Sequence, residues 1–89
     1  MRMIKALGAS APAEVQTGAG GDVNSATCVR AFNNTTTNHL VTVESPVGGG
    51  TLKGSFYLAG GANAFIEKDP SDWIFAANAG VLLTKVALR

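Results

Sequence analysis

Apolar and polar residues alternate along most of this chain with a period of two, which is the pattern of strands that bury one face. The segment from residue 52 to residue 58 is the clearest case, and its apolar face is made of Leu52, Gly54, Phe56 and Leu58. No window of the sequence sustains the 3.6-residue period of a helix. The pattern therefore predicts a chain of strands and turns.

Seven or eight short strands are predicted, separated by clusters of Gly, Asn, Asp and Pro. They cover 2–7, 26–32, 40–44, 52–58, 65–68, 73–76 and 81–88, and a further short strand around 14–17 is left open. Asn33–Asn38 is expected to form the loop of a hairpin, and Asp69–Asp72 a tight turn that its proline favours. Strands at this spacing indicate an all-β fold, a small antiparallel β-sandwich or barrel.

The chain is short enough to be a single domain of 89 residues. We divide it into an N-terminal strand with an Ala/Gly-rich arm, 1–21, and a sandwich, 22–89. The stretch 8–21 has few large apolar residues to offset an ordering cost of roughly 1–2 kcal/mol per residue. We therefore expect a partner to order this loop-rich arm. The candidate anchors are Ile4, Leu7, Pro12 and Val15.

The predicted core takes one or two residues from most strands. Its members are Val29 or Phe32, Val41, Val43, Phe56, Leu58, Ile66, Ile74 and Val86. The choice between Val29 and Phe32 stays open, because a slip of one residue inverts the face of a strand. The last strand, 81–88, is apolar on both faces, so one face can cover the core while the other meets a partner. Val81 and Leu83 are the candidate interface residues of this strand.

The charge of the chain is low and scattered. Only 15% of the residues are charged, against about 25% in typical proteins, and the net charge is +1. Such a surface offers little protection against self-association. The basic residues form no cluster and are not interleaved with aromatic residues, so nucleic acid is not an expected partner. No run of 18 apolar residues exists, so no membrane span is predicted.

The residues that carry chemistry are few. The chain has one His, one Cys and six carboxylates, and their spacing matches no catalytic, metal or cofactor site. The glycines of 18–21 lack the spacing of a phosphate-binding loop. Asp69 and Asp72 are explained by the turn, with a calcium site as the alternative. His39 is expected at the surface of a strand end, and Cys28 as a small buried apolar residue.

Trp73 and Tyr57 suggest one other function. Two exposed, coplanar rings would form a platform on which a sugar can stack, as in small carbohydrate-binding modules. A single large ring more often fills the core or an interface of a small domain, so this interpretation is the alternative.

Four segments of the chain resemble small β-sandwich virion proteins of tailed bacteriophages. These segments are Val29–Thr35, with its strand end Asn-Asn-Thr, Leu40–Val43, Phe56–Gly61, and Ile66–Ile74, with its turn Lys-Asp-Pro-Ser-Asp. The resemblance covers about half of the chain, and the N-terminal Ala/Gly-rich third lies outside it. In such proteins the turn serves geometry, and no catalytic residue is implied.

The resemblance implies a non-enzymatic structural protein of the virion, assembled in the cytoplasm of a bacterial host. The leading hypothesis is a capsid decoration or cement protein that binds the major capsid protein or another virion protein. A small homo-oligomer, with a trimer favoured, is expected, and a small-molecule ligand is not. A minor tail, neck or fibre-associated protein is the alternative within the same class.

Overall fold

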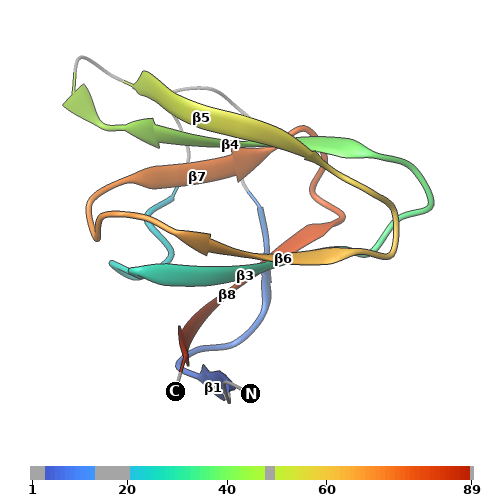
Figure 1. Ribbon diagram of the computed structural model, residues 1–89, viewed down its shortest axis with the longest axis horizontal. Helices are drawn as coiled ribbons and strands as arrows, with labels where there is room; N and C mark the ends of the chain where they lie inside the picture. Colours follow the sequence, from blue (N-terminus) through green and yellow to red (C-terminus); the bar gives the residue numbers. More distant parts are fainter. Residues whose placement is uncertain (1–3, 14–20, 48–49, 89) are drawn as a thin grey trace.

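The computed structural model describes residues 4–13, 21–47 and 50–88, and these residues form two antiparallel sheets packed face to face (Figure 1). The strands are β1 (Ile4–Ala6), β2 (Ala11–Pro12), β3 (Cys28–Asn33), β4 (His39–Ser45), β5 (Thr51–Leu58), β6 (Asn63–Glu67), β7 (Trp73–Ala76) and β8 (Val81–Leu88). The prediction of an all-β antiparallel sandwich is confirmed. The short strand left open around 14–17 lies outside the described residues.

Consecutive strands mostly alternate between the two sheets. One sheet has the order β8-β3-β6, and the other has the order β5-β4-β7. β1 and β2 follow one another along the outer edge of β8, β1 at residues 86–88 and β2 at residues 82–83. From β3 onward, only β4 and β5 form a hairpin between consecutive strands. The prediction of a hairpin at Asn33–Asn38 is wrong, because β3 pairs with β6 and β8 while β4 pairs with β5 and β7. This loop carries the chain from one sheet to the other.

The buried side chain of Asn33 explains why the chain changes sheet there. Its Nδ2 donates hydrogen bonds of 2.8 Å to the carbonyl oxygens of Thr37 and Leu58, and Leu58 ends β5 of the opposite sheet. Its Oδ1 accepts from the amide and the hydroxyl of Thr35. Gly60 lets the loop approach, because a Cβ there would lie 2.7 Å from the backbone carbon of Thr36. The amide side chain therefore fixes the turn and joins the two sheets at one end.

The core lies between the sheets and is made of small and β-branched residues. The buried apolar residues are Ala13, Ala26, Val29, Ala31, Val41, Leu58, Ile66, Ile74, Ala76, Val81, Leu83 and Val86. Of the two residues that the sequence left open, Val29 is fully buried and Phe32 is half-buried. Val43 and Phe56 pack against the core but keep contact with solvent.

A β-bulge corrects the predicted face of β5. Val43 pairs with Gly54, whereas the next residue, Glu44, pairs with Leu52, so Lys53 is an extra residue in the β5 strand. An extra residue inverts the alternation beyond it. Leu52 consequently lies on the outer face with 66% of its surface exposed, instead of beside Phe56 in the core.

The N-terminal arm is held by its own chain. The amide of Leu7 donates to the carbonyl of Lys85, and the amide of Ala13 donates to the carbonyl of Val81. Further along, Gly21 forms a bridge with Ile74 at the edge of β7. The expectation that a partner must order the 8–21 arm is therefore wrong for 8–13, because β8 supplies the pairing. In Figure 1, β1 and the end of β8 extend away from the body as a two-stranded ribbon.

Candidate interaction surfaces

Two strand edges are left unpaired on the same side of the sandwich. Among the described residues β5 pairs only with β4, and β6 only with β3. The opposite edges are covered, by β1 and β2 on β8 and by the Gly21 bridge on β7. Figure 1 looks onto the uncovered side, with β5 above and β6 below. We call the face made by β5, β6 and the gap between them the open side.

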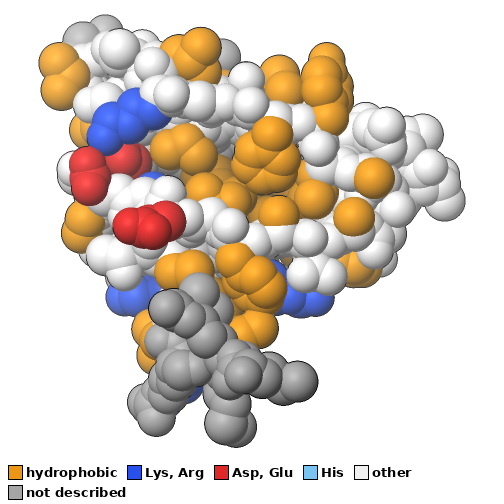
Figure 2. Space-filling view, viewed as in Figure 1, with side chains coloured by type: hydrophobic (Ala, Val, Ile, Leu, Met, Phe, Trp, Pro, Cys, Tyr) orange, Lys and Arg blue, Asp and Glu red, His pale blue; other side chains and the backbone are white. Residues whose placement is uncertain are grey.

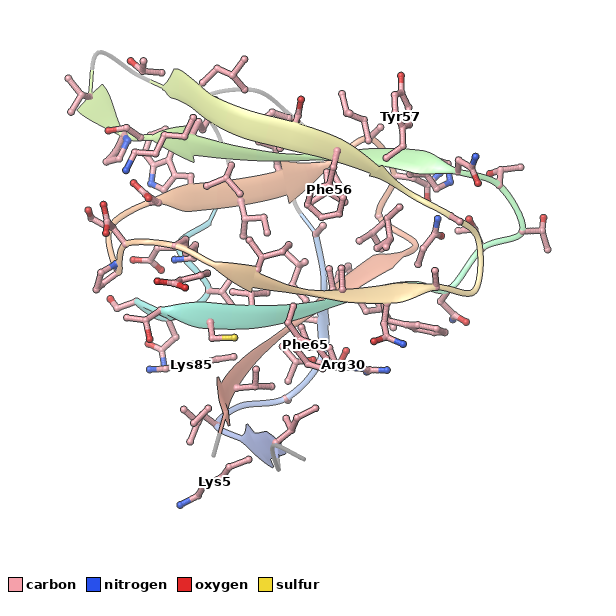
Figure 3. The ribbon with its side chains drawn as sticks, in the orientation of Figure 1. Lys5, Arg30, Phe56, Tyr57, Phe65 and Lys85 are labelled. Carbon is pink, nitrogen blue, oxygen red and sulfur yellow. The ribbon has the colours of Figure 1, made fainter. Side chains whose placement is uncertain are left out.

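The open side contains a groove with an apolar floor. Its volume is about 490 Å³, and Val43, Phe56 and Ile66 contribute the apolar part of its lining. Figure 2 shows hydrophobic side chains gathered between the two strands, and Figure 3 shows the Phe56 ring in the gap. Because an unpaired strand edge offers a row of free N–H and C=O groups beside this apolar floor, the open side suits contact with another polypeptide.

Lys53 closes one end of the groove with two carboxylates. Its Nζ lies 3.0 Å from Asp69 Oδ2 and 2.9 Å from Asp72 Oδ2. The hydrogen bond from Lys53 is the main reason that the pKa of Asp72 lies below its ordinary value, and the bond to Asp72 is the main reason that the pKa of Lys53 is raised. The only charged side chain of β5 therefore lies at the bulge and reaches across to the 69–72 turn.

The 69–72 segment is the tight turn that the sequence predicts. The amide of Asp72 donates to the carbonyl of Asp69 at 3.0 Å, and the amide of Asp69 donates back to Asp72 Oδ2 at 3.1 Å. Beside it, the buried Lys68 donates to the carbonyl of Ala26 at 2.8 Å. Burial is the chief cause that lowers the pKa of Lys68. The charged groups here fasten the turn between β6 and β7 to the body.

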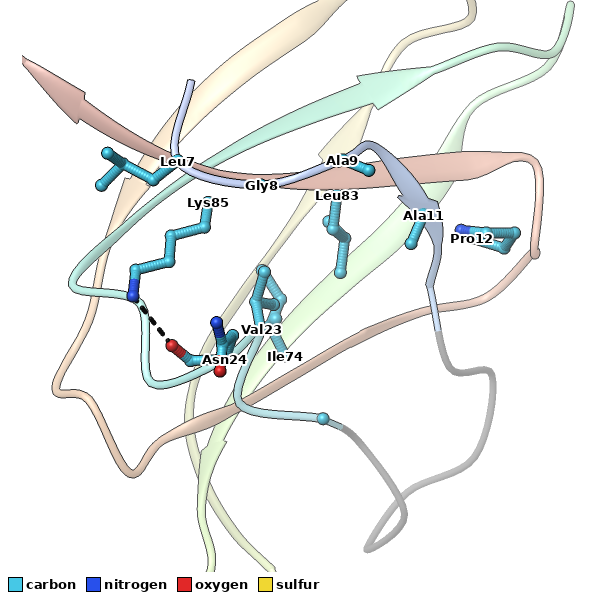
Figure 4. Close-up of a pocket in the computed structure, with 11 residues that line it drawn as sticks. Leu7, Gly8, Ala9, Ala11, Pro12, Val23, Asn24, Ile74, Leu83 and Lys85 are labelled. Atoms are coloured by element: carbon cyan, nitrogen blue, oxygen red, sulfur yellow. Dashed lines mark hydrogen bonds between the residues drawn. The ribbon is translucent and has the colours of Figure 1, made fainter. Parts of the chain in front are cut away.

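A second hollow lies on the arm side. A cavity of about 330 Å³ separates the arm from the body, with Ile74 and Leu83 at its base and the arm residues Leu7 and Pro12 among its walls (Figure 4). At its mouth Lys85 Nζ donates to the carbonyl of Asn24 at 3.0 Å. The segment that carries this carbonyl has three consecutive non-glycine residues at positive φ, namely Val23, Asn24 and Ser25, at 53°, 54° and 58°. Such a left-handed turn is strained in L-residues.

The predicted interface residues divide between surface and core. Ile4 and Leu7 are 48% and 43% exposed, and Pro12 is exposed on β2. Val81 and Leu83 are buried, because the face of β8 that carries them packs against the other sheet. They hold the sandwich together and offer no surface to a partner. Val15 lies outside the described residues.

Trp73 and Tyr57 do not form a common platform. Tyr57 pairs with Leu40 near the start of β4, whereas Trp73 pairs with Glu44 near its end and on the opposite flank. Strand geometry then separates the two residues by roughly 16 Å. Tyr57 is largely exposed and Trp73 is half-buried. The geometry gives no support to a sugar platform built from these two rings.

The remaining chemical groups are isolated. Cys28 is half-buried on β3 rather than fully buried, and burial raises the pKa of its thiol, with the Glu67 carboxylate adding to the shift. His39 lies at the start of β4, and its Nε2 is 3.1 Å from the hydroxyl of Thr37. Within the described ranges, no three His, Cys, Asp or Glu side chains gather as a metal site would require. The same ranges contain no helix that could span a membrane.

The open side could not be found from the sequence, because an edge is defined by the strands that fail to pair with it. The one local signal was the low charge of the 51–58 segment, which carries only Lys53. No family model, no curated protein and no solved structure matches this chain. The candidate surfaces therefore rest on the geometry of the chain itself.

Proposed function

We propose that this chain is a non-enzymatic structural protein of a tailed-phage particle, and that it decorates or cements the outer surface of the capsid. The proposal rests on one observation, namely the positions at which the fold leaves large apolar side chains exposed. They are Ile4, Leu7, Val47, Leu52, Tyr57 and Phe65. They lie on the arm, on the β4–β5 hairpin and on the edge strand β6. A protein that works by contact with other proteins needs apolar surface at such places.

The partner is the major capsid protein or another virion protein. The arm, with Ile4 and Leu7 exposed beside β8, is the docking side, because it extends from the body and can reach a neighbour (Figure 1). The resemblance of 29–35, 40–43, 56–61 and 66–74 to phage virion proteins supports the particle as the setting. In this role the protein is present in the virion after assembly in the host cytoplasm.

Binding to empty capsids tests the proposal. The purified protein is mixed with capsids of the phage that encodes it, and bound protein is measured after sedimentation of the capsids. We expect saturable binding that Ile4→Asp weakens at least tenfold. Thr36→Asp makes the same change of charge at an exposed residue of the sheet-crossing loop and should leave binding unchanged. Failure to bind, together with absence from purified particles, would reject the proposal.

The number of copies in a purified particle separates decoration from the alternative in the same class. A copy number comparable to that of the major capsid protein supports a decoration role. A far smaller number would assign the chain to the tail, neck or fibres. Quantitative mass spectrometry of the particle measures it directly.

A further inference from the structure

The two free edges of the open side point in the same direction, and this has a consequence for self-association. Both sheets end on this side, one at β5 and the other at β6 (Figure 1). An antiparallel strand edge is complementary to a copy of itself, because each strand offers the same alternating donors and acceptors. A two-fold axis perpendicular to the sheets lets both edges meet their copies at once. Neither sheet then keeps a free edge on this side.

We infer that a second copy of this chain docks on the open side about such an axis, with β5 against β5 of the copy and β6 against β6 of the copy. The inference concerns the isolated protein and does not depend on the proposed role in a particle. The expected homo-oligomer is then a dimer held at this surface, whereas the resemblance to phage virion proteins favoured a trimer.

The charges of the open side permit this pairing. Lysine on an edge strand normally prevents two edges from meeting. Here the only charge on β5 is Lys53, whose ammonium group is paired with the carboxylates of Asp69 and Asp72. On β6 the only charge is Glu67, and antiparallel pairing centred on Phe65 places it opposite Asn63 of the copy. Like charges therefore do not meet across the axis.

The apolar residues are placed to benefit from the contact. Phe56 is the last of the β5 residues that line the groove, and Phe65 is in the middle of β6. Figure 3 shows the two at nearly the same position along the strands, so one axis can pass close to both. Pairing about this axis brings Phe56 next to Phe56 of the copy. The apolar floors of the two grooves then become continuous, and the Phe56 ring loses its contact with solvent.

The side of the molecule that contains the open side is comparable in area with the surface that a stable dimer buries. Figure 1 is a view along the shortest axis of the molecule, and the other two extents are 38 and 28 Å. The rectangle that encloses the molecule in this view, with the β1–β8 ribbon included, is thus about 1,000 Å², and a stable interface buries about 800 Å² on each partner. A short partner peptide would cover only one of the two edges. A second copy covers both.

Sedimentation velocity of the purified protein over a range of concentrations tests the inference. We expect a species of twice the 9.1 kDa chain mass that dissociates on dilution. Ser55→Lys and Phe65→Lys add charge near the axis at exposed positions of β5 and β6, and each should raise the dissociation constant at least tenfold. Ser10→Lys, the matched change on the arm, should leave it unchanged.

Amide hydrogen exchange gives a readout that needs no variant. Amides of β5 and β6 that point away from β4 and β3 should exchange more slowly as the protein concentration rises, while those of β1 should not change. A monomer at every concentration would overturn the inference, as would a trimer or a dimer that both lysine variants leave intact. Protection confined to β1 and β8 would also overturn it, because it would place the contact on the arm.

Discussion

Asn33 is a buried amide that satisfies its full hydrogen-bonding capacity within the chain. Both of its donors and its carbonyl oxygen are used, and its side chain is fully buried. Asn33→Ala removes these hydrogen bonds, and with them the link from the loop to the carbonyl of Leu58. We expect a loss of about 2–3 kcal/mol in the free energy of unfolding, measured by urea denaturation. Asn34→Ala, at the exposed neighbour, should change it by less than about 0.5 kcal/mol. A similar small loss for Asn33→Ala would mean that the loop holds its shape without the amide.

The pKa of Asp72 predicts how stability depends on acid. Its folded pKa lies below the ordinary value of 3.8, chiefly because of the hydrogen bond from Lys53. The unfolded chain therefore takes up the proton first, so the stabilisation is full above 3.8 and is lost as pH falls through the folded pKa. We expect the melting temperature of the protein to fall through this acid range more steeply than that of Asp72→Asn. Parallel curves for the two proteins would show that the ion pair contributes nothing to folding.

The same two carboxylates predict the response to calcium. Asp69 and Asp72 share Lys53, and in the described residues no third acidic or histidine ligand joins them. Calcium takes at least six oxygen ligands, and here it would also have to displace a bound ammonium group. We expect no heat of calcium binding by titration calorimetry and only a modest loss of stability for Asp69→Asn. Micromolar binding that Asp72→Ala abolishes would contradict the role of this segment as a turn.

The bulge in β5 divides its apolar residues into two groups. Leu58 is buried, Phe56 borders the groove, and Leu52 lies on the outer face. Leu58→Ala should therefore lower the free energy of unfolding by about 2–5 kcal/mol, as for other buried leucines. Leu52→Ala should lower it by less than about 0.5 kcal/mol, because little surface is buried there. Phe56→Ala should cause a loss between these two values in the free energy of unfolding of the monomer. Equal losses at Leu52 and Leu58, measured in urea, would mean that the strand runs without the bulge.

The positions of the strands could be predicted from the sequence because alternation is a local property. The bulge could not, because Lys53 differs from a regular strand residue only in what faces it on β4. Asn33–Asn38 shows the same limit, since Asn and Thr favour a turn without deciding whether the next strand pairs with the last one. Among the candidate interface residues, Ile4 is exposed because β1 extends away from the body, and Val81 is buried because the other sheet covers its face of β8. Both depend on how distant strands pack.

The groups that make the open side come together only in the folded chain. Lys53 meets Asp69 and Asp72 across sixteen and nineteen positions of sequence. The sequence showed Asp69 and Asp72 as one turn, but it gave no reason to place a lysine there. The free edges of β5 and β6 follow from the pairing of every other strand. They are a property of the topology, which no single segment encodes.

The arm is the proposed docking side of the molecule, and two truncations separate the role of β1 from that of β2. Residues 4–6 form β1, which is exposed along its length, whereas Ala13 is buried in the core and β2 covers the edge of β8. Deleting residues 1–6 should leave the thermal unfolding transition within a few degrees of the full chain and weaken capsid binding. Deleting residues 1–20 should lower the melting temperature markedly, because β8 loses its cover and the core loses Ala13. Circular dichroism and capsid sedimentation on the same samples measure both effects. If the protein that lacks residues 1–6 unfolds, β1 is part of the folded unit. If that protein folds and binds capsids fully, the docking surface lies away from the arm.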